Sequence, residues 1–197
     1  MLIQAVIWLF NAVLIICILR RLKSSGQALA DFGIQKLDKT GMSGSRLILA
    51  ALVLFITGIL AFVLGSVVGS VFTEIPQQAN LNQYNPLKGN LLLLLPAIFL
   101  VGFASSFGEE LIYRAYLMDR VSRFLTKPSI ARTVSIIISS LVFGFAHFQW
   151  GLMGIIQTFF MGLIFALAYL KFRGNIWVNV LAHFYMDTLL LIQMYIG

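Results

Sequence analysis

The sequence predicts an all-α, polytopic membrane protein with about six transmembrane helices, because it is strongly apolar, sparsely charged and contains long uncharged segments. Of its 197 residues, 60% are hydrophobic and only 11% are charged. The mean hydropathy is +0.95. Soluble domains carry roughly 25% charged residues, so one membrane-embedded unit explains this composition better than a soluble core does.

Uncharged segments locate the expected helices along the chain. Several long segments lack Asp, Glu, Lys and Arg, among them residues 1–19, 47–73, 89–108 and 133–170. About 20 apolar residues cross a bilayer core, so the last of these segments is long enough for two helices. Gln149, Trp150 and Gly151 at its middle predict a tight turn between the two. Residues 175–197 then supply the sixth helix.

The third helix could start at Gly89 or at Pro96. We expect it to begin at Pro96, because proline suits the first turn of a helix, and to continue past Arg114. This start moves Glu109 toward the middle of the membrane.

The net charge of +7 reflects membrane topology, and no nucleic-acid partner is expected. With six spans, residues 20–46, 114–132 and 171–173 lie on one side and hold all but one of the 14 Lys and Arg. Only Lys88 lies opposite, so the positive-inside rule predicts that both termini lie outside. The single cysteine, Cys17, excludes an intrachain disulfide and a thiolate metal cluster.

Ionisable residues inside the predicted spans are the strongest functional signal. They are Glu109, Glu110, His147, His183 and Asp187. Each such group costs about 3 kcal/mol to insert at membrane depth, so these residues usually face the bundle interior and have a function. Simpler explanations exist for each: a capped span end in headgroup water for the glutamates, a helix-to-helix hydrogen bond for a histidine, and a structural partner of His183 for Asp187.

Helical spacing predicts partners within this set. Glu110 and Arg114 are four residues apart, which favours an ion pair that orients Glu110. Glu109 lies about 100° round the helix from Glu110 and is free to face another group. His183 and Asp187 are also four residues apart, so both can point into one cavity.

Aromatic and small residues surround these groups. Phe143 precedes His147 by four residues and can pack beneath its imidazole ring. No serine or cysteine nucleophile with a nearby base is apparent, and we expect the small residues of these spans to permit close helix contacts. They are Ser105, Ser106, Ser139, Ser140, Gly102, Gly108, Gly144 and Gly162.

Three carboxylates and two imidazoles on three helices are sufficient to activate a water molecule. A carboxylate can take the proton, and imidazoles can bind a divalent ion or donate to an oxyanion. The apolar surroundings strengthen these effects, and peptide hydrolysis is the natural reaction class.

Three sequence motifs occur in order on these apolar segments. Residues 109–114 match EExxxR, residues 143–147 match FxxxH, and residues 183–187 resemble HxxxN. This arrangement resembles the CPBP family, the CAAX protease and bacteriocin-processing enzymes also called Abi proteins, over residues 91–191.

The resemblance implies an all-helical intramembrane endopeptidase in the bilayer, expected in a bacterial cytoplasmic membrane, that acts on a membrane-associated peptide or protein. Residues 1–90 would form an N-terminal transmembrane hairpin with connecting loops, and residues 91–197 a CPBP-like catalytic membrane domain. Substrates are prenylated CAAX proteins in the eukaryotic branch, and peptides or membrane proteins in the bacterial branch.

The resemblance also implies roles for the motif residues. Glu109 and His147 would activate water, while His183 and Asp187 would complete the polar site or stabilise the oxyanion. Glu110 belongs to the same catalytic set. Arg114 and Phe143 are the supporting residues.

A divalent metal ion, with zinc as the candidate, is left open by the resemblance. Its ligands would be Glu109, His147, His183 and Asp187. Asp187 stands where the family usually has Asn, and an ionised Asp cannot donate to an oxyanion. It could instead bind the metal, orient His183 or be protonated in the apolar cavity.

Two functions other than proteolysis use the same residues. A non-catalytic membrane regulator or immunity protein could use the polar cavity for binding alone. Ion or proton transport also uses chains of Glu and His, although the sequence lacks the inverted repeat and broken-helix pairs typical of transporters.

Overall fold

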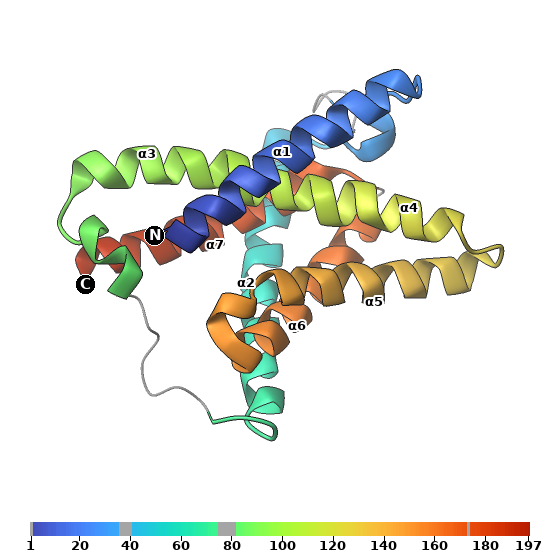
Figure 1. Ribbon diagram of the computed structural model, residues 1–197. Helices are drawn as coiled ribbons and strands as arrows, with labels where there is room; N and C mark the ends of the chain where they lie inside the picture. Colours follow the sequence, from blue (N-terminus) through green and yellow to red (C-terminus); the bar gives the residue numbers. More distant parts are fainter. Residues whose placement is uncertain (1, 36–40, 75–81, 173) are drawn as a thin grey trace.

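All regular structure in the described residues, 2–35, 41–74, 82–172 and 174–197 of the computed structural model, is helical (Figure 1). The all-α prediction is therefore confirmed. The α-helices are α1 (Leu2–Ser24), α2 (Gly44–Gly69), α3 (Leu91–Val101), α4 (Met118–Arg123), α5 (Pro128–Ala146), α6 (Gly151–Lys171) and α7 (Ile176–Ile196). The 3-10 helices are η1 (Leu29–Phe32), η3 (Asn82–Leu87) and η6 (Phe148–Trp150), and the π-helical segments are η4 (Gly102–Phe107) and η5 (Glu110–Leu117).

Helices long and apolar enough to cross a membrane dominate the described part of the chain. Five meet this criterion: Gly44–Gly69, Leu91–Arg123, Pro128–Ala146, Phe148–Lys171 and Ile176–Ile196. A further apolar helix, α1, extends past the first uncharged segment to include Arg20, Arg21 and Lys23. The chain is a multi-pass membrane protein, as its composition predicts.

The third span is one continuous helix made of α3, η4, η5 and α4. It begins at Leu91, not at Pro96, so the expected starting point is wrong. The side chain of Asn90 accepts a hydrogen bond from the backbone N–H of Leu93 at 3.2 Å and caps the helix there. The expected continuation past Arg114 is confirmed, and two π-helical segments widen the helix in its middle.

The connection between α5 and α6 is the tight turn that the sequence predicts. It consists of η6, and Gly151 follows with a φ of 71°, a conformation that favours glycine. Pro128 occupies the first turn of α5, and the side chain of Asn175 caps the start of α7 by accepting from the N–H of Trp177.

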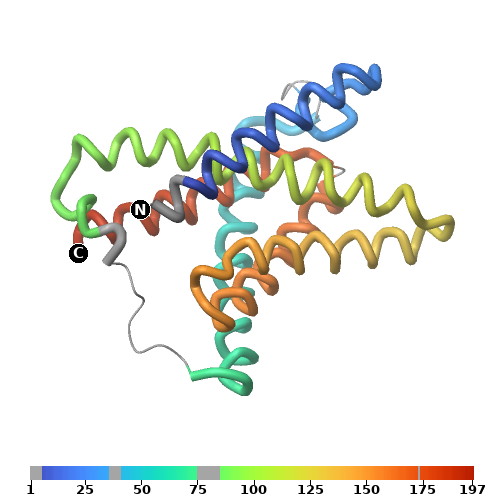
Figure 2. The backbone as a smooth tube through the Cα atoms, in the orientation of Figure 1, coloured from blue at the N-terminus to red at the C-terminus, as the bar shows by residue number. Residues whose placement is uncertain are grey.

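Helix α6 packs against both α2 and α5, and α7 packs against α2 and α3. Helix α2 runs steeply across the direction of α3 and α5, and Figure 2 shows the same crossing. Helix α1 lies against η4 and η5 instead. Thus α1 and α2 each pack on the segment after residue 90, and the division of the chain into two domains at that residue stays a prediction.

At each end of the bundle, a hydrogen bond joins segments that are far apart in the sequence. Arg120 donates from Nη2 to Oε1 of Gln27 at 2.7 Å, which joins the connection after α1 to α4. At the other end, the N–H of Gly89 donates to the carbonyl of Tyr195 at 2.9 Å. Three basic residues of the predicted inner side, Lys36, Lys39 and Arg173, lie outside the described residues.

A glycine permits a close approach between α2 and α6. A methyl group at Gly65 would lie 2.7 Å from the Cα of Gln157 and 3.2 Å from the carbonyl oxygen of Ile156. Next to this contact, Nε2 of Gln157 donates to Oγ of Ser66 at 2.8 Å. The two helix backbones therefore touch here without room for a side chain.

We predict that Gly65→Ala destabilises the protein by about 1–3 kcal/mol, because the added methyl group forces the α2 and α6 backbones apart. Gly44→Ala is the matched control, since a methyl group at Gly44 in the same helix has no neighbour within 4 Å. In detergent, thermal unfolding should show a lower Tm for Gly65→Ala and an unchanged or higher Tm for Gly44→Ala. Equal Tm values would contradict this account of the α2 and α6 contact.

Candidate active site

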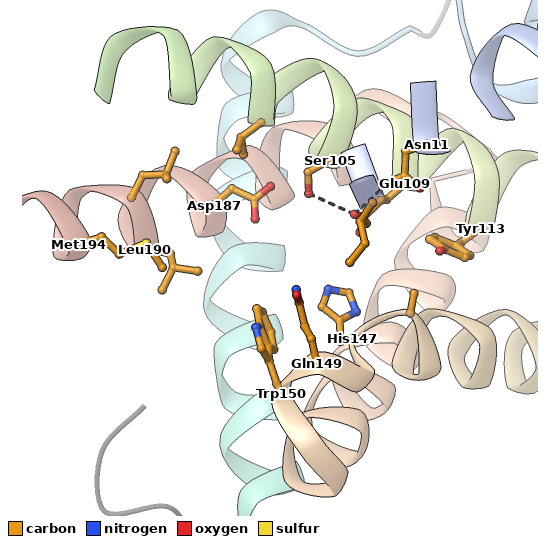
Figure 3. Close-up of a pocket in the computed structure, with 14 residues that line it drawn as sticks. Asn11, Ser105, Glu109, Tyr113, His147, Gln149, Trp150, Asp187, Leu190 and Met194 are labelled. Carbon is orange, nitrogen blue, oxygen red and sulfur yellow. Dashed lines mark hydrogen bonds between the residues drawn. The ribbon is translucent and has the colours of Figure 1, made fainter. Parts of the chain in front are cut away.

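A cavity lies between α1, the long third span, the α5–α6 turn and α7 (Figure 3). About 70 Å³ of it is open to the centre of a water molecule. One water needs roughly 10–15 Å³ of such space, so several fit. The lining residues are Ile7, Asn11, Val101, Ser105, Glu109, Tyr113, Ala146, His147, Gln149, Trp150, Asp187, Leu190, Leu191 and Met194.

Glu109 lines this cavity between the two π-helical segments, and its two carboxyl oxygens have different surroundings. Oε1 accepts hydrogen bonds from Nδ2 of Asn11 and from Oγ of Ser105, both at 3.3 Å. Oε2 is buried and has no hydrogen-bond partner among the described residues. An unpaired buried carboxylate oxygen is costly, so Glu109 is the strongest chemical signal among the residues that line the cavity.

His147 faces the same cavity from the end of α5. Its Nδ1 lies 2.8 Å from the carbonyl oxygen of Phe143, which can only accept. Nδ1 therefore carries the ring proton in the neutral imidazole, and Nε2 is left as an acceptor. The ring packs between Phe143 and Trp150, with centroid separations of 4.8 and 4.9 Å, so the expected contact with Phe143 is present.

Glu110 is directed away from the cavity into a fully buried polar network. Its Oε2 lies 3.3 Å from Nε of Arg114 and accepts a hydrogen bond from Nδ2 of Asn179 at 3.1 Å. Its Oε1 lies 2.9 Å from Nδ1 of His183. The expected ion pair with Arg114 is present, and Glu110 joins the third span to α7.

Arg114 is completely buried, which is unusual for a charged side chain. Its guanidinium lies 4.1 Å from the ring centre of Phe143 and 5.6 Å from that of Phe165. These aromatic faces and the carboxylate of Glu110 offset part of the cost of removing the charge from water, and none of the guanidinium nitrogens has a hydrogen-bond partner among the described residues.

Asp187 connects the buried network to the cavity. Its Oδ2 accepts a hydrogen bond from Oγ of Ser106 at 2.9 Å and lies 3.7 Å from Nε2 of His183. His183 thus has one nitrogen toward Glu110 and the other toward Asp187, and only Asp187 of these three lines the cavity.

The structure therefore divides the predicted site residues into two groups. Glu109, His147 and Asp187 line the cavity, whereas Glu110 and His183 belong to the buried network that also contains Arg114. Within the described ranges, no three His, Cys, Asp or Glu side chains lie together as metal ligands would. The four proposed ligands do not fit a metal site in this arrangement, and zinc stays a prediction.

Several polar residues of the site are absent from our sequence-based prediction. Asn11 and Ser105 contact Glu109, Ser106 contacts Asp187, and Asn179 contacts Glu110. We expected the two serines only to permit close helix packing. Asn11 and Asn179 could have been found as uncharged polar residues within otherwise apolar spans, where an amide needs a partner.

A comparison with protein families decides the relationship of the chain. The sequence model described as "Type II CAAX prenyl endopeptidase Rce1-like" matches residues 91–189, half of the 197-residue chain. The chain belongs to this family. The CAAX protease resemblance of the three motifs is thereby confirmed, and all the motif residues lie within the match. No curated protein and no solved structure matches the chain.

Membership places this Rce1-like protein in a family of CAAX intramembrane proteases. The matched residues run from α3 into α7 and hold both the cavity carboxylates and the buried network. Helices α1 and α2 precede the match, so Asn11 reaches the cavity from outside it.

We predict that Arg114→Ala lowers the free energy of unfolding by about 3–5 kcal/mol, because it leaves the buried carboxylate of Glu110 without its cationic partner. Glu109→Gln should change it by less than about 1 kcal/mol, since Gln keeps an oxygen that can accept from Asn11 and Ser105. Chemical unfolding in detergent measures both. Similar losses in the two variants would contradict the division into cavity and network residues.

Proposed function

We propose that the protein is an intramembrane endopeptidase that hydrolyses a peptide bond in a membrane-associated peptide or protein with a water activated by Glu109 and His147. One observation carries this proposal. Glu109, whose Oε2 has no hydrogen-bond partner among the described residues, and His147 line one cavity with room for several waters, in a chain of the CAAX protease family.

The proposed chemistry uses two acceptors on one water molecule. The water donates one hydrogen to Oε2 of Glu109 and the other to Nε2 of His147, which leaves an oxygen lone pair free for attack. As the water oxygen bonds to the scissile carbonyl carbon, Glu109 takes the first proton. The tetrahedral intermediate then expels the amine, which receives that proton, and a carboxylic acid and an amine remain.

Asp187 serves best as an orienting residue in this proposal. Its contacts with Ser106 and with Nε2 of His183 hold the carboxylate at the cavity wall. A carboxylate oxygen at that position can accept a hydrogen bond from a backbone N–H of the substrate. Tyr113, whose side chain also lines the cavity, has a hydroxyl donor that can serve the developing oxyanion.

The substrate should present apolar side chains to the cavity. One part of the wall is aliphatic or thioether in character, formed by Ile7, Val101, Leu190, Leu191 and Met194. Because the cavity lies among helices that can span a bilayer, a substrate that is itself membrane-associated reaches it most directly. The orientation with both termini outside, in a bacterial cytoplasmic membrane, is part of the same proposal.

We predict that Glu109→Gln and His147→Ala each reduce the kcat for a membrane-associated peptide by about 10²–10⁴-fold while the protein stays folded, because each removes one acceptor of the water. Glu74→Gln is the matched control, since this exposed carboxylate lies beyond the end of α2. The measurement is mass spectrometry of cleavage products in liposomes, with Tm as the check on folding.

Normal turnover by either cavity variant would refute the proposed mechanism. A wild-type protein that binds peptides without cleaving them would instead support the binding-only function. Zinc is decided separately by the metal content of the purified wild-type protein and of Asp187→Asn. Stoichiometric zinc that is lost in the variant would support a metal at the cavity.

A further inference from the structure

We propose that Asn11, on α1, is a positioning residue for Glu109: its amide holds one carboxylate oxygen so that the other stays directed at the water. This inference rests on the proposed function of Glu109. It assigns to α1 a part in the reaction, although α1 lies outside the residues that match the family.

The contacts of Asn11 are buried and join two parts of the third span. Its side chain is 3% exposed, and Nδ2 lies 3.3 Å from Oε1 of Glu109 and 3.4 Å from the carbonyl oxygen of Ala104. Ala104 belongs to the π-helical segment η4. An amide buried among apolar side chains is costly unless it is paired, and these two contacts pair it.

Ser105 completes the arrangement from the third span itself. Its Oγ donates to the same Oε1 at 3.3 Å, and Figure 3 shows Ser105 and Asn11 beside Glu109. Oε1 therefore has two neutral donors and Oε2 has none among the described residues. Neutral donors fix the orientation of the carboxylate without neutralising its charge, in contrast to Arg114 at Glu110.

Gly108, immediately before Glu109, leaves room for a side chain of α1. A methyl group at Gly108 would lie 2.7 Å from Cδ1 of Ile15. Ile15 and Asn11 are four residues apart and lie on one face of α1. The end of the Ile15 side chain therefore packs over Gly108, next to the place where the amide of Asn11 meets the carboxylate.

We predict that Asn11→Leu lowers kcat by about 10–100-fold with KM changed less than about twofold, because an apolar side chain of similar size fills the space but cannot hold Glu109. Asn11→Gln, which keeps the amide, should recover part of the loss. Ile18→Val is the matched control on α1, since Ile18 is buried but does not line the cavity. Wild-type kcat in Asn11→Leu would overturn the proposal.

A double-mutant cycle tests the proposed route through Gly108. In Gly108→Ala the added methyl group must displace Cδ1 of Ile15 and should lower kcat modestly, and the double variant with Asn11→Leu should match Asn11→Leu alone, since both changes act on the same contact. Losses that multiply fully in the double variant would overturn this coupling.

An infrared measurement keeps the inference independent of the proposed function. The carboxyl band that disappears in Glu109→Gln belongs to Glu109, and loss of a hydrogen bond in Asn11→Leu should shift it. If the wild-type protein cleaves no peptide, the proposed function fails, and the band still decides whether Asn11 holds Glu109. A band at the same frequency in Asn11→Leu would overturn the inference.

Discussion

The site depends on the interactions of the buried carboxylate of Glu110. It contacts Arg114, Asn179 and His183, and all four side chains are buried. Each partner would be costly alone in an apolar bundle, so they are stable only together. Their mutual contacts hold the third span against α7, and this contact places Asp187 at the cavity wall.

The two adjacent glutamates of the third span have different surroundings, which suit Glu110 to a structural role and Glu109 to the proposed chemistry. Glu110 has a cationic partner, whereas Glu109 has only neutral donors on one oxygen and none on the other. They lie where the long span changes between π-helical and α-helical geometry. Such π-helical segments are frequent at functional sites, because the wider turn redirects side chains and backbone carbonyl groups.

Two contacts between distant helices depend on glycines. Gly65 lets the backbones of α2 and α6 touch, and Gly108 leaves room for the side chain of Ile15 of α1 next to Glu109. In lipid, helices associate through dispersion contacts and hydrogen bonds between buried polar groups, because the hydrophobic driving force is absent. Small residues let the helices come close enough for these interactions. Helices α1 and α2 are thus integrated with the Rce1-like part of the chain through different contacts.

The sequence by itself determined the features that depend on composition and helical period. These are the membrane class, the approximate spans, the turn at Gly151 and the pair of Glu110 with Arg114, because residues four apart on a helix are always neighbours. Tertiary structure alone decided that His183 contacts Glu110, that Asn11 contacts Glu109, and that Glu109, His147 and Asp187 line one cavity while His183 lies in the buried network. Those contacts depend on how separate helices pack together. The spacing of residues along the chain does not determine the distance between side chains on different helices.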